Sequence, residues 1–371
     1  MKAIGIILAG GNSSRMQELT SRRAIAAMPV AGSYRAVDFA LSNMTNSHIQ
    51  KVAVLTQYSS RSLHEHLNSS KWWDFGRKQG GLYLFAPTIT QENAFWYRGT
   101  ADAIYQNKDF LQNSHEPYVV IASGDGIYKL DYNQVINAHI DSLADITVVT
   151  TELPEGVDNS RFGTVVTDDE NRIISFEEKP LQSSNRIVST GIYVIRRRLL
   201  LELLEKSIKN NNFDFVSGVL TRYKNQKKIC AYRMEGYWSN IATVNDYFRT
   251  NMDFLNKDIR DSFFKQYPDI YSKVDDLPPA KYNPTAVVKN SLIASGTIVN
   301  GVVENSVIFK KVYIGNNVTI KNSVILNDVQ IRDGAYIENC IVESRGTIPE
   351  GARRVGEGSI LIVDEKAERY Y

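Results

Sequence analysis

The sequence has few of the residues that build metal centres and disulfide frameworks. Its 371 residues include two cysteines, Cys230 and Cys340, and five histidines, with no HExxH pattern. Two cysteines so far apart exclude a disulfide scaffold and a cysteine-based metal motif. A reducing compartment fits best, so we expect a cytoplasmic protein. For His64 and His66 we expect structural roles.

A long apolar run and an excess of one charge sign are also missing. No stretch of about 18 apolar residues exists, so no transmembrane helix is expected. The 43 Lys and Arg residues nearly balance the 41 Asp and Glu residues, and the formal net charge is +2. Without a basic stripe, neither nucleic acid nor a membrane surface is an expected partner. The apolar N-terminus runs directly into Gly10 and Gly11, which favours a buried strand over a signal peptide.

The first two-thirds of the chain alternate short apolar segments with longer helical patterns. The expected strands are Ala3–Leu8, Lys51–Thr56, Tyr118–Ala122 and Ile146–Thr150, and the expected helical segments are Leu41–Ser47, Leu63–Leu67 and Tyr132–Ser142. Continuous apolar strands separated by helices predict an α/β fold with a mostly parallel sheet covered on both faces. Ligands of such folds bind beyond the carboxyl ends of the strands.

The last quarter of the chain repeats with a period of six residues. Val312, Val318 and Val324 follow this spacing, a second series runs from Ile325 to Ile337, and Gly and Asn recur between them. A period of six suits neither a helix nor one alternating strand. It predicts a β-helix of short strands and tight corners. An alternating β-sandwich is the other possibility, which the sustained register disfavours.

The boundary between these two parts is marked by a change in composition. A charged and aromatic segment follows Leu255, and Asp275–Ala280 contains two consecutive prolines. Such a stretch is typical of a linker. We therefore expect an α/β domain over residues 1–255, a linker over 256–284 and a β-helix over 285–371.

A glycine-rich turn follows the first expected strand, with the sequence Leu8-Ala9-Gly10-Gly11-Asn12-Ser13-Ser14-Arg15. Glycines let backbone N–H groups approach a phosphate, and Arg15 can add a charge-assisted contact. A GxGxxG pattern is absent, so a dinucleotide-binding fold does not follow.

This turn resembles the L-A-G-G-x-x-[ST]-R motif of nucleotidyltransferases that join sugar 1-phosphates to nucleotides. The resemblance extends along nearly the whole chain and is strongest to bacterial ADP-glucose pyrophosphorylase (glucose-1-phosphate adenylyltransferase). The segments that carry it, in family order, are Arg35–Asn43, Thr56–Tyr58, Trp96–Ala103, Ser123–Asp125, Arg161–Gly163, Glu177–Pro180, Ser189–Tyr193 and Gly236–Trp238. The resemblance implies a Rossmann-like nucleotidyltransferase domain and a left-handed parallel β-helix of hexapeptide repeats.

The family reaction brings several phosphates together, since glucose 1-phosphate attacks the α-phosphate of ATP and releases pyrophosphate. Catalysis therefore depends on positioning and on cations, including Mg²⁺ held by carboxylates. The family supplies an Asp in S-G-D, an Asp in W-x-D-V-G-T and a Lys in R-A-K-P. Here Asp125 is kept, but Asn240 replaces the second aspartate and Ile25 replaces the lysine. No intact catalytic set is expected, and Mg²⁺ binding at Asp125 is expected to be weak or lost.

Three further positions depart from the family pattern. Ser13 stands where the family has glycine, Gly126 where it usually has histidine, and Val216–Gly218 where it has G-K-D. The resemblance still assigns a vestigial nucleotide site to Leu8, Gly10, Gly11, Arg15, Gln57, Gly99 and Thr100.

The sugar side of the site is better kept. The resemblance implies that Lys179 meets the phosphate and Glu178 the sugar hydroxyls, although a solvated charge cluster is the alternative for these residues. It assigns Tyr97, Ser189 and Asp214 to the same site.

The family's activators bind through a G-G-K-[FY]-R segment, among other residues. Arg35 is kept here and is the expected effector residue, whereas Ser33 replaces the lysine. Activation of the fructose-bisphosphate type is therefore not expected of this chain alone.

The leading hypothesis is a regulatory, nearly inactive subunit similar to the GlgD-type subunit of some bacteria. The resemblance implies a heterotetramer with a catalytic ADP-glucose pyrophosphorylase subunit, serving glycogen biosynthesis. An active sugar-1-phosphate nucleotidyltransferase and a non-enzymatic sugar-phosphate sensor are the alternatives. An acyltransferase on the β-helix is disfavoured, because the last histidine is His139.

Overall fold

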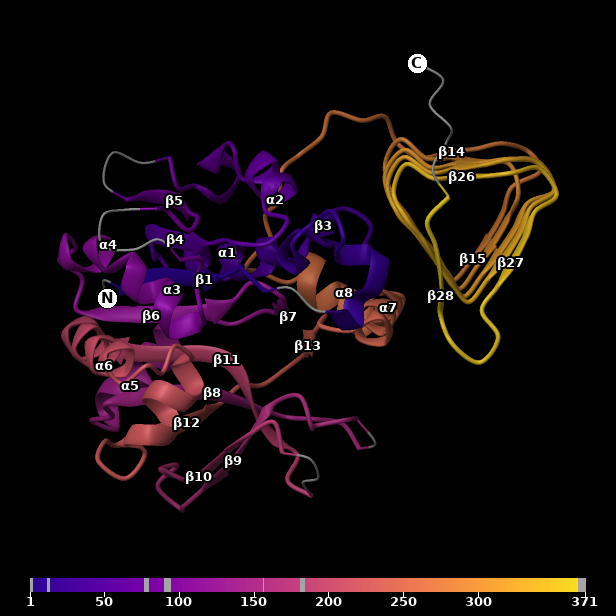
Figure 1. Ribbon diagram of the computed structural model, residues 1–371. Coiled ribbons are helices and arrows are strands. Elements are labelled where there is room, and N and C mark those ends of the chain that lie inside the picture. The colour runs from indigo at the N-terminus through magenta and orange to yellow at the C-terminus, as the bar shows by residue number, and fades with distance from the viewer. Residues whose placement is uncertain are drawn as a thin grey trace. The chain divides into compact units, whose positions relative to one another are not determined.

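The structure is a computed structural model that describes residues 3–11, 14–76, 80–89, 95–155, 157–180 and 184–365 (Figure 1). The chain divides into two compact units. The first comprises Met1–Gly11, Phe39–Ser60 and Asn68–Trp238, and the second comprises Asn12–Asp38, Arg61–Leu67 and Ser239–Tyr371. The second unit thus includes two segments from inside the expected α/β domain. The expected boundaries at residues 255 and 284 remain predictions.

A nine-stranded sheet forms the centre of the first unit. Its main path runs in the order β10-β9-β11-β6-β1-β4-β5, and β8 and β12 extend it from β11. The strands are β1 (Ala3–Leu8), β4 (Lys51–Leu55), β5 (Gly81–Phe85), β6 (Tyr118–Ser123), β8 (Ile146–Glu152), β9 (Gly163–Thr167), β10 (Ile173–Glu178), β11 (Ile187–Arg196) and β12 (Ile229–Arg233).

The predicted parallel arrangement is confirmed for the neighbours β6, β1, β4 and β5, and for the pair of β8 and β12. The strands that join these two groups are antiparallel: β11 runs against β6, β8 and β9, and β9 runs against β10. The four strands expected from the sequence are all present, within two residues of their predicted ends.

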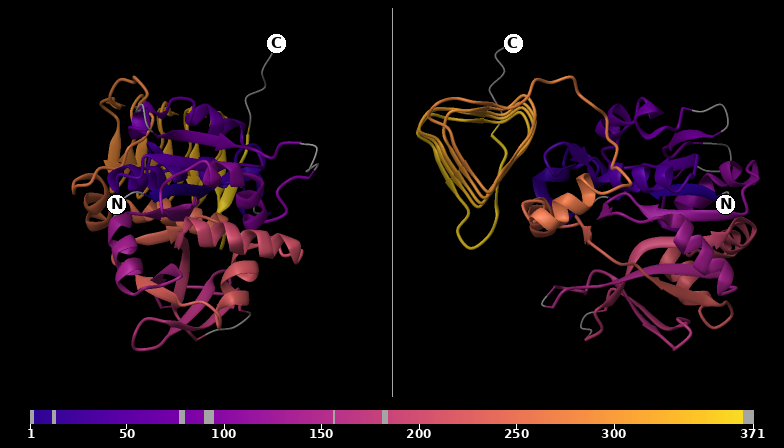
Figure 2. Two further views of the ribbon diagram at one scale, coloured as in Figure 1. Left: turned by 90° about the vertical axis from the view of Figure 1, so that its left-hand side faces the viewer. Right: turned by 180° about the vertical axis from the view of Figure 1, so that it is seen from behind.

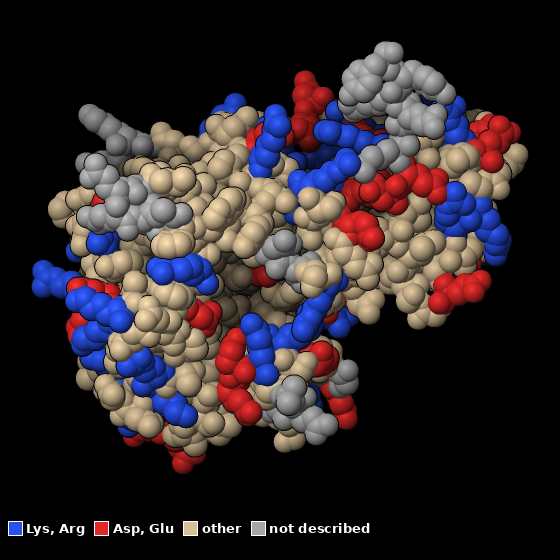
Figure 3. Space-filling view, viewed as in Figure 1, with Lys and Arg blue, Asp and Glu red and all other residues tan. Residues whose placement is uncertain are grey.

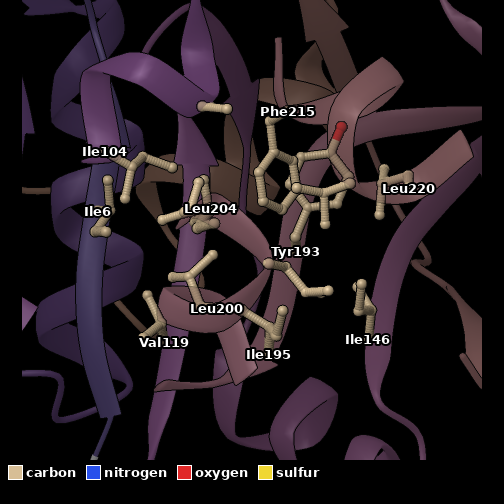
Figure 4. Close-up of a cluster of buried hydrophobic side chains, with 14 of the residues drawn as sticks. Ile6, Ile104, Val119, Ile146, Tyr193, Ile195, Leu200, Leu204, Phe215 and Leu220 are labelled. Carbon is tan, nitrogen blue, oxygen red and sulfur yellow. The ribbon is translucent and has the colours of Figure 1, made fainter. Parts of the chain in front are cut away.

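Helices cover both faces of this sheet, as predicted. Along β1, Ile4 and Ile6 point into a core that α3 and α6 complete, and Figure 4 shows Ile6 with Ile104 of α3 and Leu200 and Leu204 of α6. Gly5 points the other way, where a Cβ would lie 2.8 Å from the sulfur of Met44 in α1. A side chain at this position would therefore displace the end of the Met44 side chain, which packs closely against the sheet here.

The helices of the chain are short. They are α1 (Ala36–Asn46), α2 (Arg61–His66), α3 (Thr100–Gln106), α4 (Lys108–Gln112), α5 (Tyr132–Asp141), α6 (Arg197–Lys209), α7 (Val244–Asp253) and α8 (Lys257–Phe264), with single turns η1 (Ser14–Thr20), η2 (Ile25–Ala27), η3 (Ser70–Trp73) and η4 (Val216–Thr221). Helix α8 lies inside the expected linker. None of the described helices has the length and apolar character needed to cross a membrane.

Three parallel sheets build a triangular coil in the second unit (Figures 1 and 2). One sheet contains β14 (Lys281–Tyr282), β17 (Ile298–Val299), β20 (Tyr313–Ile314), β23 (Gln330–Ile331) and β26 (Thr347–Ile348). Another contains β15 (Val287–Lys289), β18 (Val302–Glu304), β21 (Thr319–Lys321), β24 (Tyr336–Glu338) and β27 (Arg353–Val355). The last contains β16 (Leu292–Ile293), β19 (Val307–Ile308), β22 (Val324–Ile325), β25 (Cys340–Val342) and β28 (Leu361–Val363). This is the β-helix that the six-residue period predicts.

Side chains stack along the axis of this coil. Val303, Ile320 and Ile337 follow one another in register and are fully buried. One corner of the coil is a ladder of asparagines, in which the Asn290 amide donates to Asn305 at 2.9 Å and the Asn305 amide donates to Asn322 at 2.5 Å. All three have positive φ, which asparagine adopts more easily than most residues. The recurring asparagines of the sequence are therefore corner residues.

Four short strands remain: β2 (Pro29–Val30) and β3 (Tyr34–Arg35), which pair with each other, β7 (Gly126–Tyr128) of the first unit, and β13 (Trp238–Asn240). Within the second unit, α7 is bound to the 29–31 segment. The Tyr247 hydroxyl donates to the Pro29 carbonyl at 2.7 Å, and Ala31 N donates to the Asn251 side chain at 3.1 Å.

His66 and the two cysteines lie in the interior of the protein. The His66 ring and the Asp38 carboxylate, both buried, are 2.6 Å apart. Cys230 and Cys340 are buried free thiols. The face in Figure 3 carries positive and negative side chains intermixed rather than a basic stripe.

The stacked interior of the coil predicts a large difference between two adjacent substitutions in β21. Ile320→Ala removes a fully buried side chain and is expected to lower the free energy of unfolding by about 2–4 kcal/mol. Thr319→Ala, on the partly exposed outer face, is expected to cost less than about 1 kcal/mol. Urea unfolding of both variants measures the difference, and equal losses would contradict the inward orientation of Ile320.

Candidate functional site

Three loops of the first unit begin at the same edge of the sheet. Leu8 lies opposite Leu55 and Ser123 in the parallel register. Ala9 N donates to the Leu55 carbonyl at 2.9 Å, and Gly124 N donates to the Leu8 carbonyl at 2.9 Å. The expected ligand-binding residues Gly10, Gln57 and Asp125 therefore follow strands that end side by side.

The two glycines of the first loop differ in their surroundings. A Cβ on Gly10 would lie 3.3 Å from Cβ of Gln57, whereas a Cβ on Gly11 would meet nothing within 4 Å. Gly10 thus packs closely against Gln57, whereas the space around Gly11 is open. Open space beside a glycine lets a phosphate approach the backbone. Arg15 is an exposed residue of η1, in the second unit. Ser13, at which the sequence departs from the family pattern, lies outside the described residues.

Gln57 has a role that the sequence does not reveal. Its side-chain oxygen accepts from Tyr97 N at 2.8 Å, and its amide nitrogen donates to the Tyr97 carbonyl at 3.3 Å. The amide therefore holds the backbone of the loop before α3 in place. Its assignment to the nucleotide remains a prediction.

Gly99 and Thr100 likewise join two segments of the first unit. A Cβ on Gly99 would lie 2.4 Å from the Phe213 carbonyl oxygen, so only glycine fits there. The Thr100 hydroxyl accepts from Phe215 N at 2.8 Å and donates to the Asp214 carboxylate at 3.0 Å. These contacts explain both residue types by packing, and their nucleotide role also remains a prediction.

The expected sugar-phosphate residues Glu178, Lys179, Ser189 and Asp214 lie near one another around Tyr193. Lys179 Nζ is 3.4 Å from the Glu178 carboxylate, and Ser189 Oγ is 3.4 Å from the Tyr193 hydroxyl. Burial raises the pKa of Tyr193 well above its usual value, and the negative charges of Glu178 and Asp214 add to this rise. Tyr193 is the member of the group that sequence reasoning missed, although it lies four residues after Ser189 in the same motif.

The residues of this group differ in charge and in burial. Partial burial raises the pKa of Glu178, Lys179 opposes the rise and Asp214 adds to it. Glu178 remains a hydrogen-bond acceptor of the kind that sugar hydroxyls need, and the exposed ammonium of Lys179 can meet a phosphate. Tyr97 is 9% exposed, burial raises the pKa of its hydroxyl, and Asn107 donates to that hydroxyl at 2.9 Å.

The wall beside Asp214 has been rebuilt relative to the family pattern. Asp214 accepts from Ser217 N at 2.9 Å at the start of η4, and a Cβ on Gly218 would lie 2.1 Å from Ser207 Oγ. A side chain at position 218, such as the aspartate that the resemblance implies there, fits only if the side chain of Ser207 moves. The predicted departure at Val216–Gly218 therefore extends to the shape of the wall.

The described residues do not fit a magnesium site with two carboxylates. Asp125 accepts from Ser123 Oγ at 2.5 Å, and in the second unit the Asn240 side chain accepts from Ala242 N at 3.2 Å. An amide is a neutral ligand, and this one already has a donor. Among the described residues, no three or more His, Cys, Asp or Glu side chains are grouped so that they could hold a metal ion.

Ile25 lies in an apolar environment. It is 5% exposed in η2, and its neighbours Ala24, Ala26 and Ala27 are also buried. The position at which the resemblance implies a phosphate-binding lysine is therefore a buried isoleucine in this chain.

Arg35, the expected effector residue, lines a cavity of about 480 Å³ in the second unit. Its guanidinium donates to the Ser62 carbonyl at 3.0 Å, and burial lowers its pKa while Asp38 opposes the decrease. Ser33 lies in the same wall. The Lys and Arg residues of the lining are Arg22, Arg23, Arg35, Lys273, Lys310, Lys311 and Arg345.

The chain is similar to known proteins over both of its parts. A family model described as nucleotidyl transferase matches residues 4–257, and one described as a GlmU-like C-terminal hexapeptide domain matches residues 278–365. The second match, together with the three parallel sheets, confirms the left-handed hexapeptide β-helix.

Several curated relatives have the same description. Glucose-1-phosphate adenylyltransferase of Clostridium acetobutylicum is 41% identical over 320 residues, which cover 85% of this chain and 84% of the relative. The protein of that description from Geobacillus stearothermophilus is 38% identical over 322 residues, covering 86% and 83%. That of Halalkalibacterium halodurans is 40% identical over 372 residues, covering 98% and 96%.

Burial at position 25 predicts that a lysine there destabilises the protein. Ile25→Lys places an amine in an apolar wall, which lowers its native-state pKa and costs about 2–4 kcal/mol at neutral pH. The unfolded chain then binds more protons than the native one, so the loss should shrink as the pH rises toward 10.

Urea unfolding of Ile25→Lys at several pH values tests this expectation, with the apolar Ile25→Met as control. A lysine variant as stable as Ile25→Met at pH 7 would mean that position 25 is open to water.

Proposed function

Because the chain belongs to the glucose-1-phosphate adenylyltransferase family of nucleotidyl transferases, we propose that it is a regulatory, nearly inactive subunit of that enzyme, of the GlgD type. The reaction concerned converts ATP and glucose 1-phosphate into ADP-glucose and pyrophosphate. In this proposal the chain binds a catalytic subunit and raises its activity. The observation that carries the proposal is the loss of a phosphate cation and a metal carboxylate, at Ile25 and Asn240.

The environment of Ile25 supports the first loss. A buried isoleucine has no charge to place beside a phosphate, and the surrounding alanines leave no polar replacement at that point. Charge contacts to a transferring phosphate contribute about 3 kcal/mol each when they are removed singly, and each 1.4 kcal/mol is tenfold in rate. The loss of this cation alone accounts for a decrease of about a hundredfold.

The hydrogen bonds of Asn240 and Asp125 support the second loss. Mg²⁺ in phosphoryl-transfer sites takes one or two carboxylates together with the substrate phosphates. The chain offers one carboxylate, which accepts from Ser123, and one amide, which accepts from Ala242 N. A metal bound this weakly cannot neutralise the charge that develops during transfer.

The retained sugar-phosphate group favours ligand binding without turnover. Glu178, Lys179, Ser189 and Asp214 are grouped around a buried tyrosine, and none of them is replaced. This observation favours, as a second candidate function, a non-enzymatic sensor of a sugar phosphate. An active transferase is the third possibility, and it requires other groups to replace the lost cation and carboxylate.

The proposal also places the chain in an assembly. A subunit with little activity of its own acts through a partner, so we propose a cytoplasmic heterotetramer with the catalytic subunit in glycogen biosynthesis. The cavity lined by Arg35 is its proposed effector site. Ser33 in the same wall is neutral, so the cavity depends on other basic residues.

Co-purification with the catalytic subunit of the same organism tests the proposal, followed by assays of each chain alone and of the mixture. We expect the chain alone, with ATP, glucose 1-phosphate and Mg²⁺, to be at least about 10³-fold slower than the catalytic chain, because two charge contacts are absent. The mixture should exceed the catalytic chain in kcat or in effector response. Production of ADP-glucose by the isolated chain at the rate of its relatives would refute the proposal.

Calorimetry with glucose 1-phosphate, without nucleotide or metal, tests the sensor function separately. Lys179→Gln should weaken binding about tenfold or more, because the exposed ammonium is the cation nearest to Glu178. Lys206→Gln, an exposed lysine of α6 paired with Glu202, is the matched control and should leave binding unchanged. If the unaltered chain takes up no glucose 1-phosphate, the sensor function is excluded.

A further inference from the structure

The cavity proposed as the effector site is lined by acidic as well as basic side chains. Its lining includes seven Lys and Arg residues, and it also includes Glu18, Glu65, Asp275, Asp328, Glu343 and Asp364. A cavity that receives an anion needs cations that are free to meet it. Which of these basic groups are already paired therefore decides how an anion can bind.

Arg23 is paired with a carboxylate from the far end of the chain. Its guanidinium forms an ion pair with Glu343, which directly follows β25 of the β-helix, and the two side chains are 17% and 10% exposed. Glu343 also accepts from Ser344 N at 2.6 Å. A charge pair this sheltered from water is costly to break unless another anion replaces the carboxylate.

Two more basic groups have partners inside the cavity. Lys310 Nζ is 2.9 Å from the Asp275 carboxylate, and the Arg35 guanidinium donates to the Ser62 carbonyl. By contrast, the side chains of Arg22, Lys311 and Arg345 have no ion pair with any part of the chain that the structure describes. Within the described residues the cavity thus has three cations without an ion pair, Arg22, Lys311 and Arg345, and two, Arg23 and Lys310, that are each held by a carboxylate.

Two of the unpaired cations occupy a strained position. Gly296, Lys311, Asp328 and Arg345 follow one another at the same corner of successive coils, where φ lies between 59° and 77°. Lys311, Asp328 and Arg345 each donate the backbone N–H to the carbonyl of the residue before this corner in the preceding coil, and Gly296 N donates to the Pro278 carbonyl. Glycine adopts such a φ freely, whereas a longer side chain costs about 1 kcal/mol or more.

A lysine and an arginine therefore stand where glycine or asparagine would be more stable, and both face the cavity. Strain at such positions is retained when the side chain has a task. The β-helix corner supplies Lys311 and Arg345, and the segment behind the glycine-rich turn supplies Arg22 and Arg23. Together they form a basic cluster fit for a small ligand with more than one phosphate group.

We propose that Glu343 is a tethered anion that occupies this cluster in place of a small polyphosphate ligand, and that ligand binding releases Arg23 from Glu343. The ion pair then acts as a latch between the 14–38 segment and the corner of the β-helix that follows β25. In the free state the latch holds this segment, which carries Ile25, against the coil. In the bound state the ligand bridges Arg23 to Lys311 and Arg345. This inference rests on the effector site proposed above.

The latch predicts that removal of the Glu343 charge strengthens ligand binding. Titration calorimetry with inorganic pyrophosphate, in EDTA and at low salt, should show Glu343→Gln binding at least tenfold more tightly than the unaltered chain. Glu18→Gln removes the same charge from the same cavity without touching the ion pair, and it should change the affinity less than threefold. Arg345→Gln combined with Glu343→Gln should lose the gain, which locates the binding in this cavity.

Rates of amide hydrogen exchange distinguish an opened latch from a general effect of the lost charge, which would not change these rates. Amides of residues 19–31 should exchange faster in ligand-free Glu343→Gln than in the unaltered chain or Glu18→Gln, because the latch is open. If Glu343→Gln does not fold, Glu343→Asp, which shortens the side chain by one methylene, gives the same comparison. Pyrophosphate added to the unaltered chain should produce the same change in exchange.

Equal affinity of Glu343→Gln and Glu18→Gln would overturn the latch, as would failure of every variant to bind pyrophosphate. These outcomes are separate from the subunit proposal. Activation of the catalytic chain by a variant that lacks the latch would leave that proposal intact. A latch that responds to pyrophosphate in a chain that never alters the catalytic subunit would refute only the subunit role.

Discussion

Phosphate charge has to be neutralised wherever this fold binds a ligand, and the positions of the cations decide what each site can do. In the first unit, the exposed ammonium of Lys179 remains beside Glu178. In the second, Ile25 is an apolar wall residue and seven Lys and Arg residues line one cavity. The chain thus has a cation in the group expected to bind the sugar phosphate and several in the cavity proposed as the effector site, while position 25, where the resemblance implies a lysine beside the reacting phosphates, has none.

Much of the architecture follows from local sequence patterns. The strand Ala3–Leu8 is bounded as predicted, and the period of six residues is about the length of one side of a coil whose corners have positive φ, which Asn and Gly adopt easily. Such patterns can be read from neighbouring residues, because they record which side chain points inward. Neighbouring residues do not show that 12–38 and 61–67 belong to the second unit, or that a helix forms within the expected linker. Contacts between distant segments determine both.

The same distinction applies to the site. The resemblance named Glu178, Lys179, Ser189 and Asp214, and the structure brings these residues together. It could not reveal that Gln57 bonds the backbone of Tyr97, or that Gly99 is a glycine because the Phe213 carbonyl approaches it. Each of these depends on a backbone group far away in the chain. The motifs therefore predict which side chains lie near one another better than what each one contacts.

Arg23 and Ile25 are two residues apart, and both attach the same segment to the rest of the second unit. A segment held by an apolar anchor at Ile25 and an ion pair at Arg23 is fixed by burial on one side and by charge on the other. A lysine at position 25 needs a polar surrounding, which would loosen the apolar anchor and compete with Arg23 for anions. In a catalytic chain this segment must meet a phosphate during turnover. In this chain the ion pair of Arg23 with Glu343 holds it to the β-helix instead, and the isoleucine at position 25 adds a buried apolar side chain where a lysine would need water or an anion.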